Sequence, residues 1–243
     1  MVRFTLRAAF AALFIAMAAP ASAQDSRQNE PGQFDFYVLS LSWSPSFCAA
    51  SAERGGSRNA SAQCGERPYS FVVHGLWPQY AKGFPEYCQV PAPRLDRGIV
   101  SSMLDLMPAP HLIFNEWDRH GTCSGVSPRA YFETVRKARA VVKIPPEYID
   151  LQAPLSVSAA SVEDAFIKAN PGLSQSGLAV GCDSKRLTEV PLEGAPVPGL
   201  PAGRAAQLSP GSGAHATTAR RVQLSRGAAW PRSFLFGTSG GAG

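Results

Sequence analysis

The N-terminal segment constrains the environment in which this chain must fold. Arg3 and Arg7 precede an apolar stretch at residues 8–18, and the small residues 21–23 then match a cleavage site. This pattern is typical of a secretory signal peptide over residues 1–23, and its apolar stretch is too short for a membrane anchor. We therefore expect a secreted or periplasmic protein that has no membrane contact after cleavage.

Cysteines are the next constraint, because an exported chain meets an oxidising compartment in which disulfides form and persist. The sequence has five: Cys48, Cys64, Cys88, Cys123 and Cys182. Four of them can pair within the chain and one is left over. No C-x-x-C spacing occurs, which argues against a zinc knuckle or a redox pair.

The charge distribution limits what the basic composition can mean. The formal net charge is +5, to which residues 1–23 contribute +2, residues 24–190 contribute −1 and residues 191–243 contribute +4. The excess of basic residues thus belongs to the two ends of the chain. It is not evidence that the central part binds a polyanion.

Hydrophobic patterns predict an α+β fold. Strands and helices do not alternate as they would in βαβ units, so we expect a central, largely antiparallel sheet with flanking helices, stapled by disulfides. The expected strands cover residues 34–43, 70–76 and 177–182, and the expected helices cover residues 93–107, 127–142 and 161–170.

The composition changes after residue 190. About half of residues 191–243 are Gly, Ala or Pro, and Lys, Asp, Asn, Ile and Tyr do not occur there. We interpret residues 24–190 as one domain and residues 191–243 as an irregular, low-complexity tail that is disordered or results from a frameshift.

Residues 114–123, FNEWDRHGTC, carry several chemically active groups. If they form a helix, Glu116 and His120 share a face, Arg119 lies near Glu116, and Asn115 lies near Arg119. A base, a carboxylate, a cation and an amide would then meet in one small volume. Trp117 is expected to point into the core instead.

A structural explanation exists for each of these residues taken alone. His74 ends the apolar run of residues 71–76, and a histidine in such a place is commonly a satisfied structural residue. A glutamate and a histidine four residues apart on a helix commonly form only a surface pair, worth a few tenths of a kcal/mol. The functional interpretation therefore depends on the two stretches together.

Together, HGLWP at residues 74–78 and NEWDRHGTC at residues 115–123 resemble the two active-site segments of the ribonuclease T2 family, H-G-L-W-P and H-E-W-x-K-H-G-T-C. Further landmarks occur in the expected order, among them FDFYVLSLSWSPSFC at residues 34–48 and GLAVGCD at residues 177–183. The resemblance extends over about residues 34–190.

The resemblance implies a role for each matching residue. His74 would be the general acid for the leaving 5′-oxygen, and His120 the general base for the ribose 2′-hydroxyl. Glu116 and Arg119, which stands where the family usually has lysine, would stabilise the transition state. Trp77 would stack against a base.

One departure concerns phosphate binding. Asn115 stands where the family has a phosphate-binding histidine, and an asparagine can donate a hydrogen bond but carries no charge. We therefore expect reduced turnover with the reaction class unchanged.

The resemblance also implies the disulfides Cys48–Cys64 and Cys88–Cys123. The family partner of Cys182 lies about a dozen residues downstream, where this chain has no cysteine. Cys182 is therefore expected to be unpaired.

The leading expectation is an endoribonuclease of low base specificity that needs no metal or cofactor and leaves 2′,3′-cyclic phosphate ends, with RNA as its partner and no obligate protein partner. RNA carries its own nucleophile, so one base and one acid suffice. Two alternatives remain: a zinc hydrolase that uses His74, Glu116 and His120 as ligands, and a secreted RNA-binding protein without activity.

Overall fold

A computed structural model of the 243-residue chain describes residues 26–56, 61–65, 69–151, 153–193 and 221–224. The expected signal peptide and most of the expected tail lie outside these ranges. Within them, no helix has the length and apolar character needed to cross a membrane.

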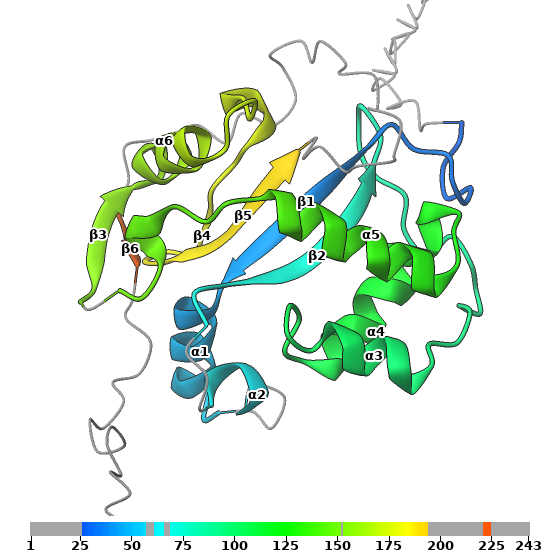
Figure 1. Ribbon diagram of the computed structural model, residues 1–243, viewed down its shortest axis with the longest axis horizontal. Helices are drawn as coiled ribbons and strands as arrows, with labels where there is room; N and C mark the ends of the chain where they lie inside the picture. Colours follow the sequence, from blue (N-terminus) through cyan, green and yellow to red (C-terminus); the bar gives the residue numbers. More distant parts are fainter. Residues whose placement is uncertain (1–25, 57–60, 66–68, 152, 194–220, 225–243) are drawn as a thin grey trace, which may run out of the picture.

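A four-stranded antiparallel sheet forms the centre of the fold (Figure 1). Its strand order is β2-β1-β5-β4, so that the first and the fifth strands along the chain are the two interior ones. A second, two-stranded sheet pairs β3 with β6. The strands are β1 (Phe36–Trp43), β2 (Phe71–Gln79), β3 (Leu155–Ser158), β4 (Gly181–Cys182), β5 (Leu187–Glu193) and β6 (Arg221–Leu224).

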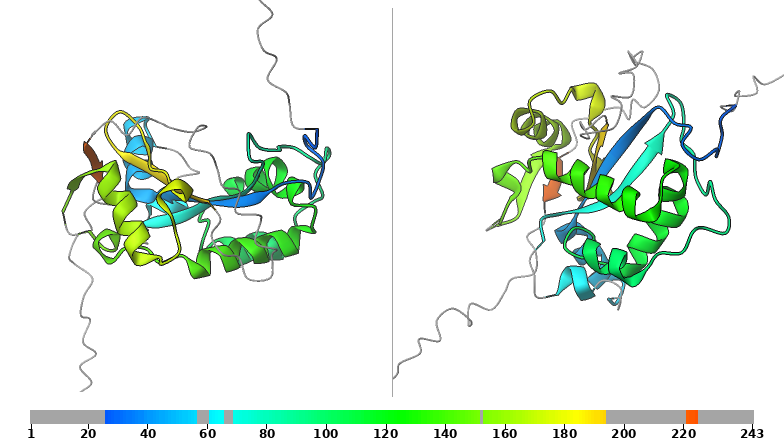
Figure 2. Two further views of the ribbon diagram at one scale, coloured as in Figure 1. Left: turned by 90° about the horizontal axis from the view of Figure 1, so that it is seen from above. Right: turned by 45° about the vertical axis from the view of Figure 1, so that its right-hand side comes forward.

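Helices surround the central sheet. Figures 1 and 2 show α5 lying across β1 and β2 on one face, with α3 and α4 close to it. The α-helices are α1 (Ser44–Glu53), α2 (Ser61–Cys64), α3 (Arg97–Met103), α4 (Pro110–Arg119), α5 (Pro128–Val141) and α6 (Ala159–Ala169). Short 3₁₀ helices cover Gly121–Ser124, Pro146–Tyr148 and Gln175–Gly177.

Strand alternation determines which residues of β1 enter the core. Leu39, Leu41 and Trp43 are buried in the main hydrophobic cluster, together with Tyr131 and Val135 of α5. Because successive side chains of a strand point to opposite faces, Ser40 and Ser42 lie on the other face of the sheet. One face of β1 is therefore committed to the core, and the other is available for polar groups.

The α+β class, the antiparallel sheet and the flanking helices are confirmed. The two disulfides are Cys48–Cys64, which joins α1 to α2, and Cys88–Cys123, and these are the pairs that the resemblance implies. Cys182 lies outside both disulfides and is exposed.

Several expected boundaries differ from the structure. The helix expected at residues 93–107 is shorter, because Asp96 accepts a hydrogen bond from the Ile99 amide and caps α3 there. The helix expected at residues 114–123 begins earlier, with Pro110 in its first turn, and ends at Arg119. The strand expected at residues 177–182 is only the two-residue β4.

The expected domain boundary at residue 190 falls inside β5, which continues to Glu193 and buries Leu192. The expected irregular tail also contains β6, at residues 221–224. The described parts of the tail are extended because their backbones pair with other strands: the end of β5 pairs with β1, and β6 pairs with β3. The remaining tail residues lie outside the described ranges.

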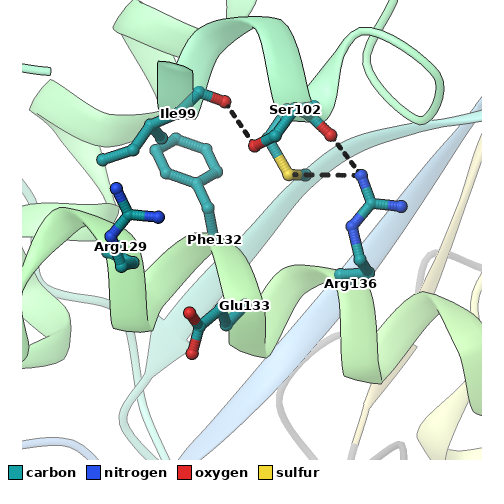
Figure 3. A pocket seen from close by; sticks show the side chains of 7 residues that line it. Ile99, Ser102, Arg129, Phe132, Glu133 and Arg136 are labelled. Atoms are coloured by element: carbon teal, nitrogen blue, oxygen red, sulfur yellow. Dashed lines mark hydrogen bonds between the residues drawn. The ribbon is translucent and has the colours of Figure 1, made fainter. Parts of the chain in front are cut away.

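A small cavity of about 60 Å³ remains between α3 and α5 (Figure 3). The charge of Arg136 on its wall is already compensated, because this side chain hydrogen-bonds Asp105 and the carbonyl oxygen of Ser102. The cavity is a packing feature of the two helices and contains none of the expected site residues.

Leu192→Ala tests whether the chain beyond residue 190 belongs to the core. Leu192 is 1% exposed, so we expect the substitution to lower the free energy of unfolding by about 2–5 kcal/mol. Leu104→Ala, which changes a leucine that is 37% exposed, is the matched control and should cost much less. Denaturant unfolding followed by circular dichroism measures both. Equal effects would contradict an interior position for Leu192.

Candidate active site

A β-bulge in β2 positions His74. Ser40 of β1 is paired with Gly75 and the next residue, Leu41, is paired with Val73, so His74 has no partner of its own across the ladder. Such a bulge shifts the inside-outside alternation by one residue. In a regular strand His74 and Trp77, three residues apart, would point to opposite faces. Here their rings lie on the same side, with centroids 5.3 Å apart.

Helix α4 brings Glu116 to these two rings. Its neighbour Trp117 is buried in the core as expected and donates a hydrogen bond to the Pro93 carbonyl oxygen, which fixes the rotation of the helix. Glu116 is 6% exposed. Its Oε2 accepts a hydrogen bond of 2.7 Å from Trp77 Nε1, and its Oε1 lies 3.7 Å from His74 Nε2.

Gly75 makes this close approach possible. A Cβ atom at this position would collide with the Glu116 carboxylate and with Trp77 Nε1. Glycine is therefore needed at this position of the HGLWP stretch because it has no side chain, which lets β2 and α4 pack closely.

His120 completes the group at the end of α4. It is the C-terminal cap of that helix, is 7% exposed, and has its ring centroid 5.5 Å from that of Trp77. No described residue offers a hydrogen-bond partner to its buried Nδ1. Burial, with the nearby charges of Arg119 and His74, lowers the pKa of His120 to about 4.

His74 has the opposite electrostatic environment. Burial alone would lower its pKa, but a hydrogen bond with Glu189 and the charges of Glu116 and Glu189 outweigh burial and raise the pKa above the ordinary 6.5. His74 thus keeps a proton at a pH where His120 has lost its own. Such a divergence is what a paired general acid and general base require.

Glu189 is a site residue that sequence reasoning missed. It lies on β5, and its Oε2 is 3.2 Å from His74 Nδ1. The two residues are 115 positions apart, and only the strand order brings them together. The available signal was an acidic residue within the strand-like stretch LTEV, at residues 187–190.

The remaining predicted residues lie at the edge of the group. Arg119 is exposed, and its Nε donates a 2.8 Å hydrogen bond to Glu86. Its charge still acts on the site, because it lowers the pKa of Glu116 and so opposes the rise that burial causes. Asn115 is exposed on α4. The structure thus brings together His74, Trp77, Glu116 and His120, and leaves Arg119 and Asn115 at the surface.

The zinc alternative requires three ligands around one point. Among the described residues, no three His, Cys, Asp or Glu side chains are placed so that they could hold one metal ion. In particular, the carboxylate of Glu116 is engaged by Trp77 Nε1. The geometry of the described residues gives the zinc alternative no support.

Two histidines whose pKa values move in opposite directions thus lie beside a buried glutamate on an antiparallel α+β scaffold. Residues 34–146 match the model of the Ribonuclease T2 family. Over this segment the chain is similar to the ribonuclease T2 family.

Relatives with ribonuclease names match nearly half of the chain. A probable ribonuclease of Haemophilus influenzae is 35% identical over 127 residues, which cover 49% of this chain and 47% of that protein. A ribonuclease of Aeromonas hydrophila is 40% identical over 113 residues, which cover 46% of this chain and 48% of that protein. The chain therefore spans about half the length of these relatives.

Solved structures share the fold. Trichomaglin, described as an S-like ribonuclease, superposes with a TM-score of 0.53 at 17% identity, over 66% of this chain and 87% of its own. An RNase-related protein from Calystegia sepium gives a TM-score of 0.51 at 20% identity, over 66% of this chain and 85% of its own. At such low sequence identities, these superpositions show a shared fold and nothing more.

Gly75→Ala tests the close packing of β2 against α4. The added methyl group would separate Glu116 from Trp77, so we expect the Trp77 indole N–H resonance to shift in the ¹H–¹⁵N spectrum and the melting temperature to fall. Gly98→Ala in α3 is the control, because its added Cβ would meet only Asp96 Oδ1, at 3.0 Å, and no residue of this site. An unchanged Trp77 resonance in Gly75→Ala would rule out the close contact.

Proposed function

We propose that this protein is an endoribonuclease that cleaves single-stranded RNA by acid–base transphosphorylation, without metal, with low base specificity and with 2′,3′-cyclic phosphate ends. The observation that carries the proposal is the pair His74 and His120, whose pKa values move in opposite directions beside one buried carboxyl group. The match to the family model and the ribonuclease names of the relatives support the same reaction class.

The proposed reaction begins at His120. Its imidazole is neutral above about pH 4 and accepts the proton of the ribose 2′-hydroxyl. The 2′-oxygen then forms a bond to phosphorus while the bond from phosphorus to the 5′-oxygen breaks. Protonated His74 donates its proton to that leaving oxygen. Because the nucleophile is the 2′-hydroxyl, DNA is not a substrate.

Glu116 and Arg119 are proposed to stabilise the crowded phosphorus in the transition state. Burial raises the pKa of Glu116, although His74, Trp77 and Arg119 counter this effect. Ionised Glu116 favours the cation of His74, and the fraction of molecules in which Glu116 is protonated can donate a hydrogen bond to a phosphate oxygen. Arg119 supplies positive charge at the rim, and Asn115 a weaker, uncharged phosphate contact.

Trp77 is proposed to bind a base. Its ring is partly exposed, and its indole N–H is fixed by Glu116, so the ring is already oriented before a nucleotide arrives. Stacking on an aromatic face is worth about 1–3 kcal/mol per base and tolerates all four bases, which agrees with low base specificity.

A secreted or periplasmic location is proposed on two grounds. Two disulfides require an oxidising compartment, and residues 1–23 have the pattern of a signal peptide, although they lie outside the described residues.

Histidine variants test the proposal. We expect His74→Ala and His120→Ala each to lower the initial rate of single-stranded RNA cleavage by roughly two orders of magnitude or more, the usual scale for lost acid–base help. His111→Ala is the matched control, because His111 is an exposed histidine at the start of α4 and should have no effect. Parent-like activity of His120→Ala would refute the assignment.

The same assay separates the alternatives when it is run in EDTA with analysis of the product ends. Cyclic phosphate ends formed in EDTA support the proposed reaction, whereas loss of activity points to the zinc hydrolase. RNA that is bound but not cut points to the inactive binding protein.

The pH dependence follows from the two pKa shifts. His120 must be deprotonated, so kcat/KM should rise as the pH increases through about 4. His74 must be protonated, so kcat/KM should fall as the pH increases through a value above 6.5. We expect a bell-shaped profile with its maximum on the acidic side of neutrality, measured with one oligonucleotide at constant ionic strength. A flat profile from about pH 4 to 8 would argue against two titrating imidazoles.

A further inference from the structure

Three neighbouring strands each contribute one residue to a polar row across the sheet. Ser40 comes from β1, His74 from β2 and Glu189 from β5. Ser40 Oγ donates a 3.0 Å hydrogen bond to Glu189 Oε2, and the same oxygen lies 3.2 Å from His74 Nδ1. Ser40 is fully buried, so its hydroxyl holds the carboxylate in a fixed position.

The two ring nitrogens of His74 have different surroundings. Nδ1 lies next to Glu189, whereas Nε2 points toward Glu116 at 3.7 Å. A carboxylate can only accept a hydrogen bond, so its contact with Nδ1 requires a proton there. A second proton on Nε2 is then the one that can be transferred, and after transfer the ring remains in the neutral form with Nδ1–H.

We propose that Glu189, held by Ser40, is a positioning residue that orients His74, fixes its tautomer and keeps it protonated as the general acid. This inference rests on the proposed function, because it concerns His74 as the general acid of that reaction. It does not make Glu189 a catalytic residue, because Glu189 acts through His74. A carboxylate that orients a histidine in this way is a recurrent arrangement in enzymes.

The charges around His74 agree with this role. Glu116 of α4 and Glu189 of β5 both favour the cation of His74, while Arg119, at the end of α4, acts on Glu116 and on His120. The contact with His74 in turn lowers the pKa of Glu189, with a smaller contribution from Ser40. Glu189 therefore keeps its charge to a lower pH than an ordinary glutamate does.

Glu189→Gln separates charge from shape. Glutamine fills the same space and can still accept a hydrogen bond from His74 Nδ1. Because it carries no charge, it no longer favours the His74 cation. We expect the pKa of His74, followed by NMR titration, to fall by on the order of one unit. The falling limb of the pH profile of kcat/KM should move down with it, while the rising limb set by His120 should stay in place.

Glu193→Gln is the matched control. Glu193 lies four residues further along β5 on the same face of the strand, and it is paired with Val38, away from His74. This substitution should leave both limbs of the profile and the titration of His74 unchanged. A merely structural effect of losing a glutamate from β5 would instead appear in both variants.

A measurement on the parent protein keeps the inference testable even if Glu189→Gln does not fold. The ¹⁵N shifts of neutral His74 should report the tautomer with the proton on Nδ1. The other tautomer, or a His74 pKa in Glu189→Gln equal to that of the parent, would overturn the inference. Failure of the parent to cleave RNA would reject the proposed function instead, and the titration would still decide whether Glu189 sets the protonation of His74.

Discussion

The double pairing of β1 is the interaction on which the site depends. β1 pairs with β2 on one side and with β5 on the other, and both pairings are antiparallel. One face of β1 is buried in the core, which fixes its register, because a slip of one residue would expose Leu39 and Leu41. A fixed β1 in turn fixes the position of His74 on one neighbour and of Glu189 on the other. The hydrophobic effect thus determines the geometry of a polar site on the opposite face.

The same scaffold gives two chemically identical side chains different protonation states. His120 ends a helix among buried groups and has no described partner for Nδ1, so its neutral form is favoured. His74 lies between two carboxylates, so its cation is favoured despite burial. The difference in protonation between the two rings therefore follows from which elements surround each of them.

Much of this arrangement could be predicted from local sequence. The two short stretches around His74 and His120 identify the central residues, and alternating or helical patterns identify the strands and helices that carry them. Helix ends were less predictable, because caps such as Asp96 are chosen by local hydrogen bonds. Glu189 could not be predicted, because its place beside His74 depends on the strand order. The end of β5 was also missed, because the change of composition near residue 190 concealed a core strand.

The distance of Glu189 from His74 along the chain has a consequence for biogenesis. Synthesis proceeds from the N-terminus, and contacts between distant segments form late and slowly. Both histidines emerge long before β5 does, so an unfinished chain already contains the two reacting groups without the interior strand of the sheet. The environment of His74 is complete only after β5 has inserted beside β1. This order delays completion of the His74 environment until nearly the whole domain has been made.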